Sequence, residues 1–261
     1  MRICRPVWLI ALLLVSVNAY AESAIALNTR PDVVQKALVI RPDKPVAAVV
    51  LFAGGPGTLK LDGTSLVSGK GNFLVRSREK FADHGFVVVT VDAPSDHAGE
   101  RGMLGGFRAS TEHAQDIDVV IAHIKKEANV PVWLVGTSRG TESATNVAIR
   151  ATAPVAGLVL TSSVTEPNSD GVAVTEMALD RIKTPVLVVV HKDDGCRVTP
   201  PSGAERIKKG LKNAPKVEIQ TFSGGKPPKS KPCGATSQHG FLGIEAEVVG
   251  AIAAFIKSNS L

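Results

Sequence analysis

Short runs of apolar, mostly β-branched residues alternate along the chain with longer segments in which apolar residues recur every three or four positions. The apolar runs cover residues 33–40, 46–52, 86–91, 132–135, 156–160, 186–190 and 216–222. The periodic segments cover residues 72–84, 111–128, 141–151, 172–182, 204–211 and 244–256. Runs that are apolar on both faces are typical of parallel strands covered by helices on either side. The pattern therefore predicts an α/β fold with a mostly parallel central sheet.

The N-terminal segment, residues 1–21, has the features of a secretory signal peptide. Two arginines precede an apolar run over residues 7–17, and residues 19–21 read Ala-Tyr-Ala, which fits a small-residue cleavage site. The run is too short to span a bilayer as a helix. We expect an exported protein, periplasmic or secreted, with one domain over residues 22–261 and no stable membrane insertion. A retained N-terminal anchor is the alternative.

Composition and charge add little about partners. The formal net charge is +6, and only 4% of the residues are aromatic. Scattered basic residues without a set of aromatic rings do not form a stacking platform for single-stranded nucleic acid. We expect a small-molecule substrate, no nucleic-acid partner and no cofactor, and the sequence leaves the oligomeric state open.

Two cysteines, Cys196 and Cys233, would remain after cleavage. An even number of cysteines in an exported protein favours a disulfide bond. Two separate buried thiols are the alternative.

One serine lies between two glycines directly after a predicted strand. The strand at residues 132–135 leads into Gly136-Thr137-Ser138-Arg139-Gly140. The pattern Gly-x-Ser-x-Gly is short enough to occur by chance, so it makes Ser138 a candidate nucleophile only if suitable partners lie nearby.

Suitable partners follow two later strands. Asp193 and Asp194 come after the strand at residues 186–190, and His239 comes after the last strand and a long loop. Ligands in open α/β sheets bind at the carboxyl ends of the strands, where these residues would meet Ser138. A serine hydroxyl needs a neutral imidazole to take its proton, and a carboxylate to orient that imidazole.

A glycine-rich turn, Ala53-Gly54-Gly55-Pro56-Gly57, follows the strand at residues 46–52. Glycines expose backbone N–H groups because no side chain covers them. Gly55 N–H, together with Arg139 N–H, is the candidate oxyanion hole. A plain tight loop is the alternative for this turn.

These motifs in this order resemble the α/β-hydrolase superfamily: GTSRG as the nucleophile elbow, AGGPG after an early strand, the two aspartates, and HGF before the last helix. The resemblance spans nearly all of residues 22–261 and implies a Ser-Asp-His triad. In this family the acid often lies nine residues after a proline that opens its strand, which implies Asp194 from Pro185, with Asp193 as the alternative. The sequence departs from the family at Ala53, where many members have histidine.

The resemblance implies a serine hydrolase that cleaves small carboxylic esters through an acyl-enzyme. A peptidase or amidase with the same triad is one alternative, and a non-catalytic binding protein with this fold is another. Only about 25 residues separate the strands at 156–160 and 186–190, which leaves no room for a cap domain and predicts a shallow site. The loop at residues 95–106 is a candidate cover for it.

Two further expectations concern the acid loop. A Cys196–Cys233 bond would tie the loop of Asp194 to the loop of His239. A metal site at His191, the aspartates and Cys196 is disfavoured, because these residues lack the spacing of metal-binding motifs.

Overall fold

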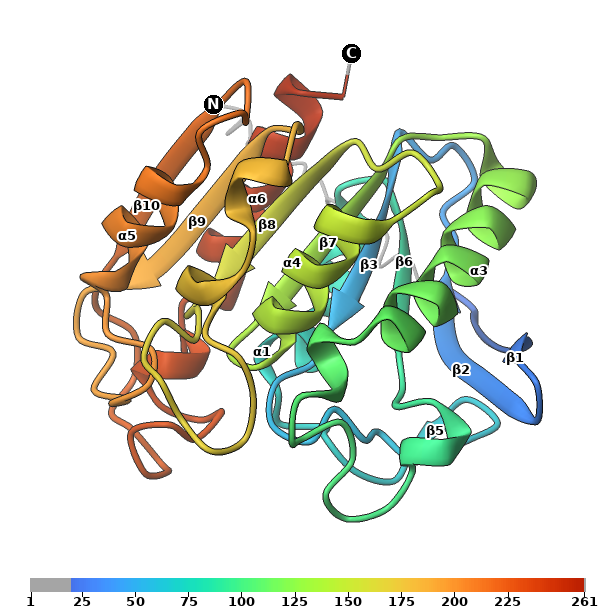
Figure 1. The fold of residues 1–261 in the computed structure, drawn as a ribbon, viewed down its shortest axis with the longest axis horizontal. Coiled ribbons are helices and arrows are strands. Elements are labelled where there is room, and N and C mark those ends of the chain that lie inside the picture. The colour runs from blue at the N-terminus through green and yellow to red at the C-terminus, as the bar shows by residue number, and fades with distance from the viewer. Residues whose placement is uncertain (1–19, 261) are drawn as a thin grey trace, which may run out of the picture.

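The computed structural model describes residues 20–260, and an eight-stranded sheet forms its centre (Figure 1). The strand order is β1-β2-β6-β3-β7-β8-β9-β10. The β1–β2 and β2–β6 pairs are antiparallel, and every other neighbouring pair is parallel. The strands are β1 Glu22–Arg30, β2 Val33–Ile40, β3 Ala47–Phe52, β6 Phe86–Val91, β7 Val132–Thr137, β8 Gly157–Thr161, β9 Val186–His191 and β10 Val217–Phe222. The predicted α/β fold with a mostly parallel sheet is confirmed.

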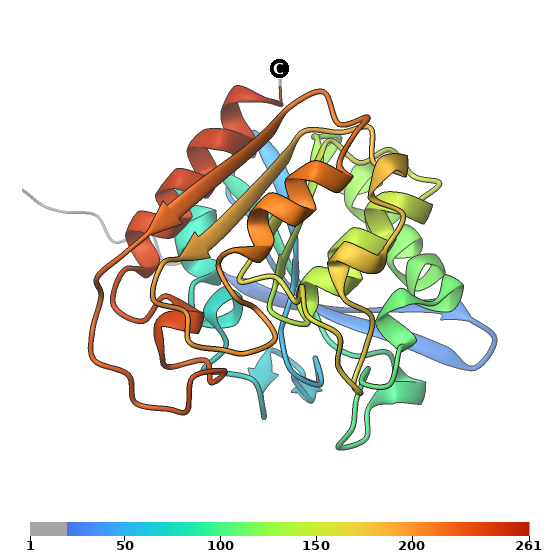
Figure 2. The same ribbon diagram turned by 60° about the vertical axis from the view of Figure 1, so that its left-hand side comes forward.

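Helices cover both faces of this sheet (Figures 1 and 2). The helices are α1 Phe73–Arg76, α2 Arg78–Asp83, α3 Thr111–Ala128, α4 Gly140–Arg150, α5 Gly203–Gly210 and α6 Glu245–Ser258. One buried cluster joins α3, α4 and α5 to one face, and a second joins α1, α2 and α6 to the other. The central strands β3, β6, β7, β8 and β9 are buried along their whole length, which explains why their sequences are continuously apolar.

Local sequence sets the limits of the longest helix, α3. The Ser110 side chain accepts a hydrogen bond from His113 N–H at 3.0 Å and so caps the first turn. Asn129 ends the helix in the left-handed conformation, with φ of 46°. Between them, Ile117, Val120, Ile121 and Ile124 are buried against the sheet. Their spacing is the helical periodicity from which the helix was predicted.

Two predicted helices differ from the structure. Residues 72–84 form two short helices, because Ser77 takes φ of −102° and ψ of 3° and interrupts the helical backbone. Residues 172–182 form two 3-10 turns, Val174–Glu176 and Leu179–Arg181, so the expected α-helix was wrong. Val174 and Leu179 are both buried in the core although five positions separate them, a spacing that one face of an α-helix does not provide.

The pattern also missed the first strand. β1 pairs antiparallel with β2 at the edge of the sheet, and its side chains alternate between half-buried and exposed. The predicted signal peptide lies outside the described residues except for its last two. Within residues 20–260, no helix is both long and apolar enough to cross a membrane.

The loops that follow β3, β7, β9 and β10 gather at one edge of the sheet, the lower edge in Figure 1. The sequence-predicted site residues all lie in these loops, so the fold itself brings them to one end of the molecule.

One buried histidine makes the stability of the fold depend on pH. His113 is 1% exposed, and its ring lies against Phe52 and Phe107. Burial, aided by the charges of Arg108, His97 and Arg30, lowers the pKa of His113 to about 3. Below the ordinary pKa of about 6.5 the unfolded chain therefore takes up a proton that the folded chain does not.

We expect the free energy of unfolding to fall as pH drops below about 6.5, with this residue contributing about 2 kcal/mol of loss at pH 5. Urea denaturation at pH 7 and pH 5 measures the loss. His113→Leu should show a smaller loss over the same interval, because leucine does not titrate. Equal losses in the two proteins would contradict the assignment.

Candidate active site

Ser138 lies on a sharp turn between β7 and α4, with φ of 52°. Two glycines make this turn possible. A Cβ atom on Gly136 would lie 2.4 Å from the carbonyl oxygen of Gly140, and one on Gly140 would lie 2.0 Å from the carbonyl oxygen of Phe52. Only glycine fits at either position, so the close approach of α4 to β3 and β7 holds Ser138 in a left-handed conformation.

The glycine-rich loop after β3 lies directly against this serine. A Cβ atom on Gly54 would be 3.0 Å from the Ser138 Cβ atom. The two segments border a pocket of about 310 Å³, which His239 also lines. The structure thus brings the candidate nucleophile, the candidate base and the glycine loop together around one cavity.

Two backbone N–H groups, one in the glycine loop and one in the residue after Ser138, have no partner among residues 20–260. Gly55, with φ of 60°, and Arg139, at the start of α4, donate to no acceptor in the described chain. The Arg139 amide also lies at the positive end of the α4 dipole. Their placement suits an oxyanion, which needs N–H donors from both sides of the nucleophile.

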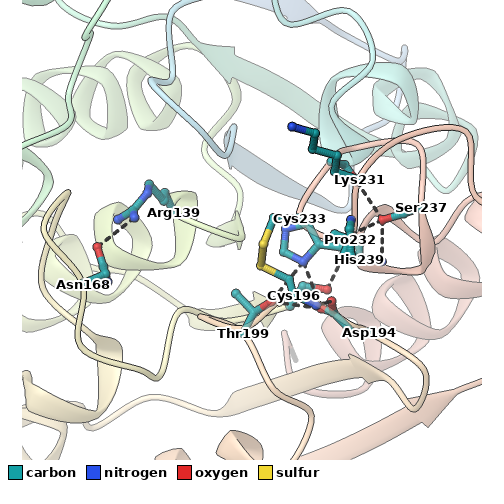
Figure 3. The surroundings of a disulfide bond; sticks show 12 residues. Arg139, Asn168, Asp194, Cys196, Thr199, Lys231, Pro232, Cys233, Ser237 and His239 are labelled. Carbon is teal, nitrogen blue, oxygen red and sulfur yellow. Dashed lines mark hydrogen bonds and ion pairs between the residues drawn. A yellow bond between two sulfur atoms is a disulfide. The ribbon is translucent and has the colours of Figure 1, made fainter.

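His239 lies in a 3-10 turn, Gln238–Gly240, and is 4% exposed. Its Nδ1 atom is 2.9 Å from Asp194 Oδ2 (Figure 3). A proton on Nδ1 bonds to that carboxylate and leaves Nε2 free to accept a proton. In this structure the Ser138 hydroxyl makes no hydrogen bond to the imidazole, and the two groups meet only as walls of the same pocket.

Asp194 rather than Asp193 lies beside the imidazole. Asp194 is buried, and its Oδ1 atom accepts the Cys196 N–H at 2.9 Å. Asp193 is exposed, and its N–H donates to His191 Nδ1 at 3.1 Å. The other ring nitrogen of His191, Nε2, lies 3.1 Å from Gly224 O, so both ring nitrogens are bonded to backbone groups.

The structure contains the expected disulfide between Cys196 and Cys233. It crosslinks the turn that carries Asp194 to the loop that carries His239 (Figure 3). Cys233 is also part of the pocket wall. Ser237 strengthens the same loop, because its hydroxyl donates to Pro232 O and Gly234 O. Since Cys196 is oxidised, it has no thiolate to offer a metal ion.

The Arg139 side chain points away from His239, toward Asn168 (Figure 3). Its guanidinium donates to Asn168 Oδ1 at 2.7 Å and to Glu142 Oε1 at 3.1 Å. Burial raises the pKa of Glu142, although Arg108 and Arg139 oppose the shift. The side chain of Arg139 is therefore engaged within the protein, which leaves its backbone N–H as the candidate oxyanion donor.

The loop at residues 95–106 does not line the pocket, so the expected cover is not seen. His97 stacks on Phe107, with ring centroids 3.6 Å apart, and pairs with Asp96. The charged side chain that does line the pocket is Lys70, from the loop before α1.

Sequence reasoning missed Thr199, which is 2% exposed. Its hydroxyl donates to Asp194 Oδ2 and lies 3.1 Å from both that oxygen and His239 Nδ1. It therefore fixes the carboxylate against the imidazole. No motif marks a threonine five residues after the acid, so this contact could not be predicted from the sequence.

Comparison with known proteins agrees with this fold. A family model described as serine aminopeptidase, S33, matches residues 71–180. A search of curated proteins finds no match. An esterase of Pyrococcus furiosus is 12% identical, with a TM-score of 0.64 over 93% of this chain and 94% of that one.

Two further solved structures are similar. An esterase from an Arctic intertidal metagenomic library is 14% identical, with a TM-score of 0.62 over 92% of this chain and 94% of that one. A serine hydrolase homologue from Coxiella burnetii is 18% identical, with a TM-score of 0.61 over 92% of this chain and 100% of that one. The protein therefore has the α/β-hydrolase fold of these structures, and residues 71–180 match a hydrolase family model.

Thr199→Val should lower kcat for hydrolysis about 10- to 150-fold, because a hydrogen bond to a charged group contributes about 1.5–3 kcal/mol. KM should change little, since Thr199 does not line the pocket. Thr199→Ser keeps the hydroxyl and should restore most of the activity. A Thr199→Val enzyme with the kcat of the unmodified protein would contradict the role.

Removal of the disulfide should weaken both stability and activity. The bond closes a loop with a sequence separation of 37, worth about 4 kcal/mol in the chain-entropy estimate. The Cys196→Ser/Cys233→Ser variant should melt earlier and have a lower kcat, because Asp194 and His239 lose their crosslink. Iodoacetamide labelling of both thiols in unreduced protein would show that the bond is absent.

Proposed function

We propose that the protein is a serine hydrolase that cleaves small carboxylic esters through an acyl-enzyme. The observation that carries this proposal is the meeting of Ser138 and His239 at one pocket, with Asp194 bonded to the far side of the imidazole. The esterases among its structural neighbours support the same reaction.

Each group has a defined role in this mechanism. Ser138 Oγ attacks the ester carbonyl while His239 Nε2 takes its proton, and Asp194 stabilises the resulting imidazolium. The N–H groups of Gly55 and Arg139 bind the developing oxyanion, each contributing about 2.7–4 kcal/mol. His239 then protonates the leaving alcohol, and water releases the acid from the acyl-enzyme by the same steps in reverse.

The match to the aminopeptidase family model makes a peptidase the second candidate. An aminopeptidase binds a protonated α-amino group, for which a carboxylate is the natural partner. Within the described residues the pocket is lined by Lys70 and by no carboxylate, which favours uncharged or anionic esters over N-terminal amines.

We also propose that residues 1–21 are a cleaved signal peptide and that the mature protein is exported as a single domain. The disulfide supports export, because such bonds persist in oxidising compartments.

Ser138→Ala should abolish hydrolysis of p-nitrophenyl acetate, and a fluorophosphonate probe should label the unmodified protein at Ser138 alone. Ser65→Ala, an exposed serine in the short strand β5 (Ser65–Leu66), is the matched control and should keep full activity and labelling. A Ser138→Ala variant that still turns over the ester would overturn the proposal. Faster cleavage of an aminoacyl p-nitroanilide than of the ester would favour the peptidase.

A further inference from the structure

Arg108 is the second largest side chain that is fully buried in the described chain, with 1% exposure. It lies in the 3-10 turn Phe107–Ala109, just before α3. A buried guanidinium is costly unless its donors are bonded, and burial lowers the pKa of Arg108 to about 10. A residue that is so costly to bury is expected to have a specific structural role.

Its hydrogen bonds go to the two segments that carry the candidate oxyanion donors. The Nη2 atom donates to Ala53 O at 2.9 Å and to Gly55 O at 3.1 Å, both in the glycine loop. The Nη1 atom donates to Ser143 Oγ at 2.6 Å, on the helix whose first turn carries the Arg139 N–H. One guanidinium thus joins the loop to α4.

These bonds determine where the Gly55 N–H points. In a trans peptide the N–H is directed opposite to the carbonyl oxygen. The Gly54 carbonyl accepts the Gly57 N–H at 3.3 Å, so the Gly55 N–H, in the same peptide plane, points to the other side. Arg108 donates to the carbonyls of Ala53 and Gly55, which belong to the peptide planes before and after the Gly54–Gly55 plane. It therefore fixes both neighbouring planes.

The loop is shaped to admit the guanidinium. Gly57 has φ of 76°, and a Cβ atom there would lie 2.5 Å from Arg108 Nη2 and 2.4 Å from the Met103 methyl group. The segment that carries Arg108 is itself fixed to the loop, because Met103 N–H donates to Pro56 O at 2.9 Å. Ala53 contributes its carbonyl, and not its side chain, to this arrangement.

We propose that Arg108 is a positioning residue for the oxyanion hole, holding the Gly55 N–H in line with the Arg139 N–H. This inference rests on the proposed function. Arg108 does not line the pocket, so it acts through the backbone of the glycine loop and not on the substrate.

Three variants test the proposal with p-nitrophenyl acetate. Arg108→Met removes every donor at similar length and should lower kcat about 100-fold, the effect of losing one oxyanion donor, with KM within about twofold. Arg108→Lys keeps the charge and one donor, and should recover about tenfold of that loss. Arg150→Met, an exposed arginine at the far end of α4, is the control and should match the unmodified enzyme.

A second measurement separates the oxyanion hole from general damage. A short-chain trifluoromethyl ketone forms an oxyanion on a serine and mimics the transition state, so its Ki should rise in proportion to the loss of kcat/KM across the variants. If Arg108→Met is too unstable to purify, Arg108→Lys carries both measurements.

Unchanged kcat and Ki in a folded Arg108 variant would overturn the inference, even if its melting temperature falls. Ser143→Ala removes only the bond to α4 and should lower kcat less than Arg108→Met, because both loop carbonyls remain bonded in that protein. Failure of the proposed function looks different, since the unmodified enzyme would then not hydrolyse the ester.

Discussion

The close packing of α4 against the ends of β3 and β7 is the constraint on which the rest of the site depends. Gly136 and Gly140 have no room for a side chain, and the Phe52 carbonyl blocks a Cβ atom on Gly140 at 2.0 Å. The chain can pass this point only if Ser138 takes a left-handed conformation, which a non-glycine residue adopts at a cost of about 1–3 kcal/mol. The same contact places the loop after Phe52 beside the serine.

Most of the fold could be predicted because its central strands are buried on both faces and its long helices are amphipathic. The prediction of helices and strands failed where the spacing of apolar residues does not match one regular element. β1 is an edge strand with mixed exposure, and residues 172–182 form two separate 3-10 turns that pack against α4 and α5. Ser77 interrupts a helix in a way that its neighbours' apolar spacing does not reveal.

The site could be predicted only as far as its members follow strand ends. Ser138, Asp194 and His239 do so, and the topology of a parallel sheet brings such positions together. Thr199 and Arg108 act through hydrogen bonds between segments far apart in the sequence. Neither Thr199 nor Arg108 belongs to a local sequence motif, and the sequence alone does not show whether an arginine is buried or exposed.

The acid and histidine side of the candidate site is held by a covalent bond, and the glycine-loop side by hydrogen bonds. The difference follows from the kind of group that each side has to position. On the acid side the functional atoms belong to side chains, so a covalent Cys196–Cys233 link between their backbones leaves Asp194 and His239 free to bond to each other. In the proposed oxyanion hole the donors are backbone N–H groups, whose direction is set by the positions of the neighbouring carbonyls. A carbonyl oxygen accepts but does not donate, so the natural clamp is a side chain with several donors in a fixed plane. Arginine is the residue that provides this.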